Sequence, residues 1–411
     1  FILIVLKIVL PRYDAIQGRL DKVALVTREN LDGLRVIRAY TAEKYQEDKF
    51  AGISEKLMKD EVFSNRGLNL LTPIVQLIFG ALNVAIYFIG ANLIAGNDPT
   101  FQYADIAVVV QFSALILTGF ILLVAVMLQM PRTIVCANRV NEVIDTEPAV
   151  KGAESTPEIR EEGTIEFKNV TFTFPGAERP VVENVSFKVG KGETIAFIGA
   201  TGSGKSTIIN LLLRFMDVTK GEILVDGVNV KDYRTEDLNA RFGYVPQKGY
   251  LFHDTLQNNI TIGRPDASPV VVDKALDISQ SKEFVSKLPG GVDYEISQGG
   301  KNVSGGQRQR LCIARALVME PEIFVFDDSF SALDYRTDKI LRGEIKKRCA
   351  GVTNVIVAQR VGTILDAGQI VCLDEGRVMG IGTHRQLLDT CPIYREIALS
   401  QMTAEELGIQ E

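Results

Sequence analysis

The first third of the chain changes between charged stretches and long stretches without charge. Residues 1–10 are apolar except for Lys7, and residues 11–66 are charged and helix-prone, with few helix breakers. Uncharged runs of about 30 and about 25 residues follow at 67–97 and 106–131, and each is long enough to cross a bilayer as a helix. Residues 1–10 are too short to span alone and resemble the cytoplasmic end of a longer helix. The pattern therefore predicts two full membrane spans and the end of another.

The charges around the two runs predict their orientation. The loop at 97–105 carries only acidic residues, whereas basic residues flank the pair on the outside, at Lys56, Lys59, Arg66, Arg132 and Arg139. Since positive residues concentrate on the cytoplasmic side, both outer flanks are predicted to be cytoplasmic and the loop external. A buried helical hairpin of a soluble protein is the alternative, and two uncharged runs of this length disfavour it.

Two further features subdivide the chain. Gly33 interrupts the helix-prone stretch and predicts a turn between two long helices. A polar segment with two prolines follows the second uncharged run, as is typical of an exposed linker. The predicted division is a partial transmembrane domain at 1–144, a linker at 145–163 and a soluble domain at 164–411.

The soluble half begins with strands of alternating hydrophobicity and continues with strands that alternate with helices. Period-two patterns and an Asp226-Gly227 turn predict a small antiparallel sheet built from 164–174, 185–189, 222–225 and 228–230. Apolar strands separated by helices predict a parallel nucleotide-binding core that includes 194–198, 323–326 and 355–358. Residues 370–373 and the turn after them predict a last hairpin. The predicted fold class is an all-α membrane domain followed by an α/β domain with an antiparallel β subdomain.

Composition narrows the class of protein. Hydrophobic residues make up 46% of the chain and the mean hydropathy is +0.12, which the uncharged runs account for. The net charge of −6 gives no nucleic-acid signature. The five cysteines are scattered without a C-x-x-C pair, so reduced thiols are predicted rather than a zinc site or disulfides. The chain opens on Phe1 inside an apolar run, which predicts a fragment that lacks its N-terminal part.

Residues 199–206, GATGSGKS, match the phosphate-binding pattern G-x-x-x-x-G-K-[ST]. An apolar strand leads in and a helix leads out, and this context disfavours the alternative of an ordinary glycine-rich turn. Glycines let backbone N–H groups turn toward a polyphosphate, and the start of the helix adds positive potential. Lys205 supplies a charge for the outer phosphates, and Ser206 supplies a hydroxyl for Mg²⁺. The predicted nucleotide-binding residues of this loop are Gly199, Thr201, Gly202, Ser203, Gly204, Lys205, Ser206 and Thr207.

Two acidic residues end the apolar strand at 323–326. Asp327 and Asp328 lie at its carboxyl end, where ligands bind open α/β sheets. Asp327 is suited to hold Mg²⁺ through water, and Asp328 is placed to orient an attacking water. The pattern is weak alone and strong beside a phosphate-binding loop.

A second anion-binding pattern occurs at 303–310, VSGGQRQR. Its Ser-Gly-Gly turn comes directly before an amphipathic helix, and the start of a helix favours an anion. An ordinary glycine turn with a helix cap is the alternative. The chain thus carries two motifs that are suited to bind phosphate.

The kind, order and spacing of these motifs resemble those of an ABC transporter half-subunit of the exporter type, over essentially the whole chain. The motifs are the phosphate-binding loop, Gln247 in YVPQ, the signature Ser304-Gly305-Gly306-Gln307, Asp327, and SALD at 331–334. The resemblance implies an ATP-binding domain with a helical subdomain that carries the signature. It also implies that two such domains pair head to tail, with each ATP between the phosphate-binding loop of one and the signature of the other.

The resemblance further implies roles for single residues. Phe174 occupies the position of the aromatic residue that stacks on adenine, where tyrosine is usual. Gln247 would contact Mg²⁺ together with Ser206 and Asp327 and would report ATP to the membrane domain. Asp334 joins the signature residues as a nucleotide-binding position.

The resemblance also implies which parts of the transmembrane domain the first 144 residues form. Residues 28–34 resemble a cytoplasmic coupling helix that docks on a nucleotide-binding domain. Residues 1–10 would end the fourth of six spans, and the first three would be absent.

Two residues depart from the family's pattern, and both belong to one site. Members that hydrolyse ATP well have Glu after the Mg²⁺ aspartate and His in the last switch segment, whereas this chain has Asp328 and Gln359. The shorter Asp withdraws its carboxylate by roughly 1.5 Å, and such a misplacement can cost about 100-fold in rate. Gln carries no charge and exchanges no ring proton. The departures predict a site that binds ATP and hydrolyses it slowly, with Asp328, Gln359 and Gln247 as its catalytic set; neutral drift with retained hydrolysis is the alternative.

The intact signature implies a heterodimer, in which this chain completes the ATP site of a second half-transporter that supplies Glu and His. The resemblance implies the degenerate-site subunit of a multidrug-type exporter in the plasma (inner) membrane, in contact with lipid, with a cytoplasmic ATP-binding domain and no nucleic-acid partner. A mainly regulatory subunit that gates a competent partner is a second hypothesis. A soluble ABC ATPase of DNA repair or translation is a third, which the two spans argue against. The substrate stays open among drugs, lipids and peptides.

Overall fold

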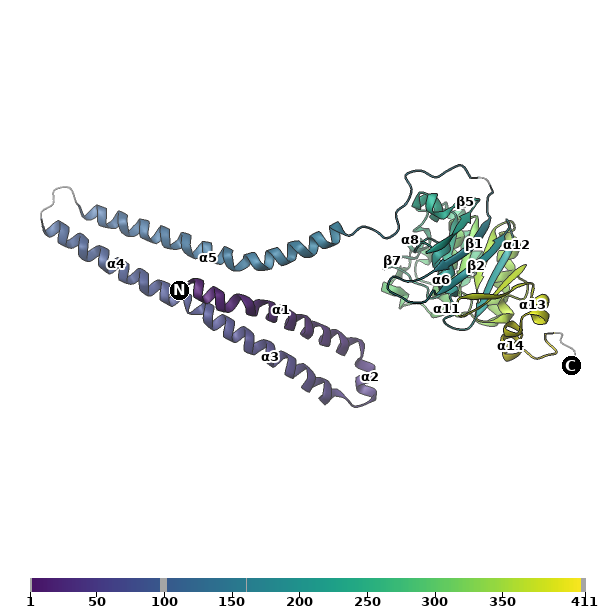
Figure 1. The fold of residues 1–411 in the computed structure, drawn as a ribbon, viewed down its shortest axis with the longest axis horizontal. Helices are drawn as coiled ribbons and strands as arrows, with labels where there is room; N and C mark the ends of the chain where they lie inside the picture. Colours follow the sequence, from purple (N-terminus) through teal and green to yellow (C-terminus); the bar gives the residue numbers. More distant parts are fainter. Residues whose placement is uncertain (1, 97–101, 160, 408–411) are drawn as a thin grey trace. The chain divides into compact units, whose positions relative to one another are not determined.

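The computed structural model describes residues 2–96, 102–159 and 161–407. The chain forms two compact units, Phe1–Thr146 and Glu147–Glu411 (Figure 1). Residues 97–101 of the predicted external loop lie outside the described part.

The first unit is all helical. α1 packs against α3, and α4 packs against α5. Arg19 of α1 forms an ion pair with Asp60 and donates to the carbonyl oxygen of Lys56 at 2.8 Å, while Lys49 binds Glu29 at 3.1 Å. The helices are α1 (Ile2–Asp32), α2 (Leu34–Ala39), α3 (Glu43–Asn69), α4 (Leu71–Ala95) and α5 (Tyr103–Asp145).

Both predicted spans are found as helices. Pro73–Ala95 and Tyr103–Leu123 are long and apolar enough to cross a membrane, and only 6% of each is buried within the chain. Their apolar side chains therefore need lipid or further helices to cover them. The second helix does not end with its apolar run but continues to Asp145, so its 43 residues extend over about 65 Å.

The predicted turn at Gly33 is confirmed, and a second turn also lies between the long helices. α1 ends at Asp32, the short helix α2 follows, and a second turn at 40–42 precedes α3. The second turn contains neither glycine nor proline, so no local pattern predicted it; Thr41 adopts φ +52° there. The predicted coupling segment 28–34 is consequently divided between the end of α1 and the first residue of α2.

The second unit is built on a six-stranded sheet with the order β12-β11-β3-β10-β9-β6. β12 is antiparallel to β11, and all other neighbours are parallel, as predicted for a nucleotide-binding core. Every residue of β9 is buried, as expected for a parallel strand covered on both faces. The strands are β3 (Thr194–Gly199), β6 (Phe242–Val245), β9 (Ile323–Asp327), β10 (Thr353–Val357), β11 (Gln369–Asp374) and β12 (Arg377–Gly382).

The predicted antiparallel sheet is confirmed, with the order β2-β1-β4-β5. Asp226 and Gly227 both have positive φ, +55° and +76°, as a two-residue hairpin turn requires. Two predicted ends are wrong: Val230 begins a 3-10 turn because the Asn229 side chain accepts from Lys231 N, and Phe174 lies beyond the last residue of β1. The strands are β1 (Ile165–Phe172), β2 (Val182–Val189), β4 (Lys220–Val225) and β5 (Val228–Asn229), and a separate pair is β7 (Asp254–Thr255) with β8 (Glu295–Ile296).

Two hydrophobic cores lie on opposite faces of the six-stranded sheet. Val355 and Val357 of β10 face the core shared with the antiparallel sheet and α6, whereas Ile356 faces the core covered by the later helices. α11 packs against α8 and α9, forming the predicted helical subdomain. The helices are α6 (Lys205–Leu212), α7 (Thr235–Asn239), α8 (Leu256–Thr261), α9 (Pro269–Ile278), α10 (Lys282–Val285), α11 (Gly305–Val318), α12 (Tyr335–Arg348), α13 (His384–Thr390) and α14 (Pro392–Gln401).

The segment predicted as a linker packs along the second unit. Ala153 N donates to the carbonyl oxygen of Tyr233 at 3.0 Å, and the Thr156 hydroxyl donates to Asp237 at 2.6 Å. Further on, Gly163 N donates to Asp226 Oδ1 at 2.6 Å. The buried carboxylate of Asp226 thus holds the end of this segment at the start of β1.

Asp226→Asn is expected to stabilise the second unit at neutral pH. Burial and then the charge of Glu322 raise the pKa of Asp226 to about 6, while Gly163 N and Arg241 oppose the rise. Because the folded pKa lies above the ordinary value of 3.8, this group's contribution to stability is full below about pH 4 and is lost as the pH rises through about 6. The rise in pKa from 3.8 to about 6 corresponds to about 3 kcal/mol, which solvent screening reduces to about 1–2 kcal/mol. Calorimetric unfolding of wild type and variant should differ at about pH 7.5 and converge near about pH 4; equal stability at both pH values would contradict the assignment.

Candidate active site

The carboxyl ends of the parallel strands bring the motifs together at one edge of the sheet. The register pairs Val357 of β10 with Phe197 of β3 and with Asp327 of β9, so β9 and β10 end level and β3 continues to Gly199. Ligands of open α/β sheets bind at this edge. The segments that leave the strands here carry the loop 199–206, Gln247, Asp328 and Gln359.

The phosphate-binding loop depends on its glycines. Gly204 precedes α6 at φ +94°, a conformation that other side chains rarely adopt. A Cβ on Gly199 would lie 2.1 Å from the carbonyl oxygen of Leu373, so no larger residue fits. The amides of residues 205–207 come before the first hydrogen bond of the helix, from Ile208 N to Gly204 O at 3.0 Å. These N–H groups are the free donors of the helix start, and they form an anion-binding site.

The Lys205 ammonium lies over this loop. It donates to the carbonyl oxygens of Gly199 and Ala200, both at 2.8 Å. Burial lowers the pKa of Lys205, and the charges of Asp328 and Asp327 oppose the change. A cation held by backbone carbonyls is placed to exchange those contacts for phosphate oxygens.

Ser206 and Asp327 form a donor set that fits Mg²⁺. The Ser206 hydroxyl binds the Asp327 carboxylate, which is 7% exposed. Burial and then the Asp328 charge raise the pKa of Asp327, while Lys205 and Ser206 lower it. Hydroxyl and carboxylate oxygens are the hard ligands that Mg²⁺ prefers, completed by water and phosphate. The described part of the chain holds no group of three His, Cys, Asp or Glu suited to a metal ion.

Asp328 is held in an uncommon backbone conformation. Its φ of +47° lies in the left-handed region, which costs a non-glycine residue about 1–2 kcal/mol. Asp328 N donates to Val357 O at 2.9 Å, and the Ser331 hydroxyl donates to Asp328 O at 2.8 Å. These bonds fix where the carboxylate points.

One oxygen of the Asp328 carboxylate accepts from two glutamine amides. Gln359 Nε2 donates to Asp328 Oδ2 at 2.9 Å, and Gln247 Nε2 donates to the same atom at 3.2 Å. The three residues predicted as the catalytic set therefore lie in contact. The carboxylate predicted to orient water thus accepts from two neutral donors, and neither donor can take up a proton as a histidine would.

The signature residues form a separate group. Ser304 Oγ accepts from Gln307 N at 3.2 Å, and Gln307 Oε1 accepts from Ser304 N at 2.9 Å, a reciprocal cap at the start of α11. A Cβ on Gly305 would meet no atom within 4 Å, so this turn faces open space. Within the described residues, no hydrogen bond or ion pair joins 304–307 to the loop 199–207. The phosphate-binding loop and the signature thus do not form one site within the described residues.

Two other predicted residues also stand apart from the phosphate-binding loop. Asp334 caps α12, accepting from Thr337 N at 2.9 Å, and this bond lowers the pKa of Asp334. Phe174 is 43% exposed and lies edge-on to Phe172, with 4.9 Å between ring centroids. Its open ring face is available for stacking.

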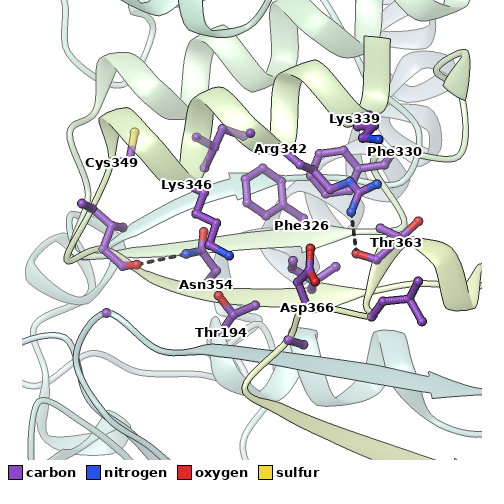
Figure 2. Close-up of a pocket in the computed structure, with 18 of the residues that line it drawn as sticks. Thr194, Phe326, Phe330, Lys339, Arg342, Lys346, Cys349, Asn354, Thr363 and Asp366 are labelled. Atoms are coloured by element: carbon purple, nitrogen blue, oxygen red, sulfur yellow. Dashed lines mark hydrogen bonds between the residues drawn. The ribbon is translucent and has the colours of Figure 1, made fainter. Parts of the chain in front are cut away.

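A cavity of about 520 Å³ lies under α12, away from these groups (Figure 2). Its lining includes Phe326, Arg342 and Asn354, and Figure 2 shows Arg342 reaching the backbone of Thr363. None of its lining residues belongs to 199–207 or 304–307. A much smaller hollow lies at the candidate active site itself, where Asp328, Val357 and Arg360 are among its lining residues.

Sequence reasoning missed Gln309. This residue is 2% exposed on α11, where it donates to Pro246 O at 3.0 Å and accepts from Gly249 N at 3.1 Å. It therefore holds the backbone on both sides of Gln247. The available signal was a glutamine on the buried face of an amphipathic helix, since a buried amide requires partners.

Comparison with known proteins agrees with this geometry. The family model for the ABC transporter matches residues 182–331, and the model for the ABC transporter transmembrane region matches residues 1–127. An uncharacterized ABC transporter ATP-binding protein of Mycobacterium tuberculosis (strain ATCC 25618 / H37Rv) is 37% identical over 407 residues, covering 97% of this chain and 69% of the relative. An ATP-dependent lipid A-core flippase of Haemophilus influenzae is 31% identical, covering 98% of this chain and 68% of the flippase. A solved bacterial Atm1-family ABC exporter with ATP bound superimposes with a TM-score of 0.85 at 27% identity, covering 97% of this chain and 71% of the exporter.

The fold and the motifs define a transport ATPase whose helical membrane domain is fused to an α/β nucleotide-binding domain. The chain belongs to the ABC transporter family and has the architecture of an exporter-type half-transporter.

Proposed function

We propose that this chain is one half of a heterodimeric ABC exporter and that its own ATP site turns over slowly. The observation that carries the proposal is the Asp328 carboxylate, whose Oδ2 accepts from both Gln247 and Gln359. The intact, outward-facing signature at 304–307 supports a role in completing the ATP site of a partner. The partner would be a second half-transporter with Glu and His at the two deviant positions.

Different residues of this chain would bind the phosphates, the adenine and the Mg²⁺ of the nucleotide. The amides of 205–207 and the Lys205 ammonium would hold the phosphates, and Phe174 would stack on adenine. Ser206, Gln247 and Asp327 would hold Mg²⁺, which neutralises phosphate charge when bound. The remaining loop residues proposed to contact ATP are Gly199, Thr201, Gly202, Ser203 and Gly204, and those proposed to contact the partner's ATP are Ser304, Gly305, Gly306, Gln307 and Asp334.

The slow step follows from what Asp328 and Gln359 lack. Asp328 would have to orient water with a carboxylate withdrawn by roughly 1.5 Å relative to that of Glu, a misplacement that can cost about 100-fold in rate. Gln359 donates a hydrogen bond but supplies no positive charge where negative charge develops. The site would therefore bind ATP and hydrolyse it slowly, and it would act mainly by holding ATP between the two paired nucleotide-binding domains.

The membrane half supports an exporter of the plasma (inner) membrane with the nucleotide-binding domain in the cytoplasm. The lipid A-core flippases among the relatives favour a lipid-like substrate, and a multidrug role would extend the same preference for amphipathic molecules. A mainly regulatory subunit is the second candidate function, because the short Asp328 side chain and the uncharged Gln359 favour gating over turnover.

The purified homodimer of this chain in lipid is expected to show poor ATPase activity. Lys205→Ala in the heterodimer is expected to weaken nucleotide binding at this chain by about tenfold or more, since a charged phosphate contact is lost. Transport assays then separate the two functions: abolition indicates direct drive, and a modest loss indicates regulation. Robust turnover by the homodimer would contradict the slow-site proposal.

A further inference from the structure

Gln401, the last residue of α14, makes two hydrogen bonds with its side-chain amide to the switch segment that contains Gln359. Its Nε2 donates to Gln359 O at 2.9 Å, and its Oε1 accepts from Val361 N at 2.8 Å. The two bonds hold the backbone on both sides of Arg360. Since backbone atoms are held, the contact does not depend on which side chain stands at position 359.

The held backbone carries the side chain that reaches Asp328. Gln359 Nε2 donates to Asp328 Oδ2 at 2.9 Å, directly beside the atoms that Gln401 binds. Asp328 is in turn fixed to β10, the strand that leads into the switch segment, by its N–H bond to Val357 O. A continuous chain of hydrogen bonds therefore runs from the C-terminal helix to the carboxylate.

The same arrangement occurs on the other side of Asp328. Gln309 holds Pro246 O and Gly249 N around Gln247, just as Gln401 holds Gln359 O and Val361 N. Both side chains that touch Asp328 thus leave loops held by a glutamine from a different helix. An amide that donates and accepts at once fixes a loop in position and orientation, which a single hydrogen bond does not.

The C-terminal segment is anchored in the core. Tyr394 and Ala398 of α14 are fully buried, and Leu407, beyond the helix, is 8% exposed within the same core. Between them, Thr403 N donates to Glu406 Oε2 at 3.0 Å and Glu406 N donates to Thr403 Oγ1 at 3.3 Å, a reciprocal cap for the last turn. Gln401 is therefore held between two anchored stretches.

We propose that Gln401 is a positioning residue for the switch and that residues 392–407 set the rate of ATP turnover by holding Gln359 against Asp328. The inference rests on the proposed role of these two residues in turnover. Loosening the C-terminal segment would release the switch without removing any group that contacts nucleotide. The segment is thus a point from which a modification or a partner could adjust the ATP site.

Hydrogen exchange of the full-length protein in lipid tests the contact without relying on catalysis. Gln401→Ala is expected to raise amide exchange across 359–363 by about tenfold, because Val361 N loses its acceptor. Leu407→Asp should raise it as well through loss of the anchor. Ser400→Ala, next to Gln401 and bound only to Ile397 O, is the matched control and should change nothing there.

Turnover tests the positioning role, measured in wild type and in an Asp328→Glu, Gln359→His background that gives a larger signal. Gln401→Ala should lower kcat by about 5- to 20-fold in both, with KM for MgATP and Tm nearly unchanged. Gln401→Glu, which keeps the acceptor for Val361 N, should restore protection in part. Unchanged exchange, unchanged kcat, or a joint loss of kcat, nucleotide binding and Tm would each overturn the proposal. If the wild-type site hydrolyses ATP rapidly and Gln401→Ala still lowers its kcat, the slow-site proposal is refuted. The positioning role of Gln401 is supported by that same result.

Discussion

The double variant Asp328→Glu with Gln359→His is expected to raise ATP hydrolysis at this chain's site by about 10- to 100-fold. Glu extends the carboxylate beyond the point where Gln247 and Gln359 now hold it, and His adds a ring that can carry positive charge. The backbone bonds from Gln401 are retained, so the new His starts from a held position. Single-turnover hydrolysis by the assembled transporter in lipid measures this site apart from its neighbour.

Each single variant is the internal control for the pair. Asp328→Glu alone should give a smaller gain, because Gln359 still supplies no charge. Gln359→His alone should place a ring beside a carboxylate that is too short to orient water. If the double variant hydrolyses ATP at the wild-type rate, the deviant residues do not limit this site, and a deviant partner signature becomes the explanation.

Gly305→Asp is expected to reduce ATP turnover by the assembly more than about 100-fold while leaving nucleotide binding to this chain's own loop intact. A carboxylate there would face the phosphates that the signature is proposed to bind, and like charges repel strongly in a closed site. The fold should tolerate the change, because a Cβ at this position meets no atom within 4 Å and an acidic residue suits the first turn of a helix. ATPase assays with the partner present, together with nucleotide binding to the separate chain, measure both effects.

Val270→Asp is the matched control for this variant. Val270 is 76% exposed and lies in the first turn of α9, so it accepts the same charge in the same kind of position, outside any predicted site. Its ATPase activity should equal that of wild type. If Gly305→Asp also keeps turnover within about twofold, the signature of this chain does not complete a working ATP site.

The sequence predicted those features whose signal is local. An uncharged run of sufficient length can only be buried or placed in lipid, so both spans were found. Alternating apolar residues defined β1 and β2, and the Asp226-Gly227 pair defined the hairpin between β4 and β5. The phosphate-binding loop was readable because glycines, lysine and serine occur at fixed spacing between a strand and a helix.

The features that the sequence missed are one turn without a local signal and contacts between residues far apart in the chain. The second turn at 40–42 carries no glycine or proline, and the predicted linker is held by Tyr233 and Asp237. Hydrophobic periodicity cannot predict such contacts, because a polar residue in a loop gives the same sequence pattern whether its side chain binds water or a distant backbone group.

By itself, the sequence therefore determined the membrane helices, the nucleotide-binding core and the identity of the residues at its edge. Only the tertiary structure decided how those residues meet: that Gln247 and Gln359 share one oxygen of Asp328, and that Gln309 and Gln401 hold the loops that carry them. The physical reason is that hydrogen-bond partners are set by the packing of whole elements. Gln401 lies 42 residues from Gln359 and Gln309 lies 63 residues from Pro246, and only the packed sheet and helices bring them within 3 Å of each other.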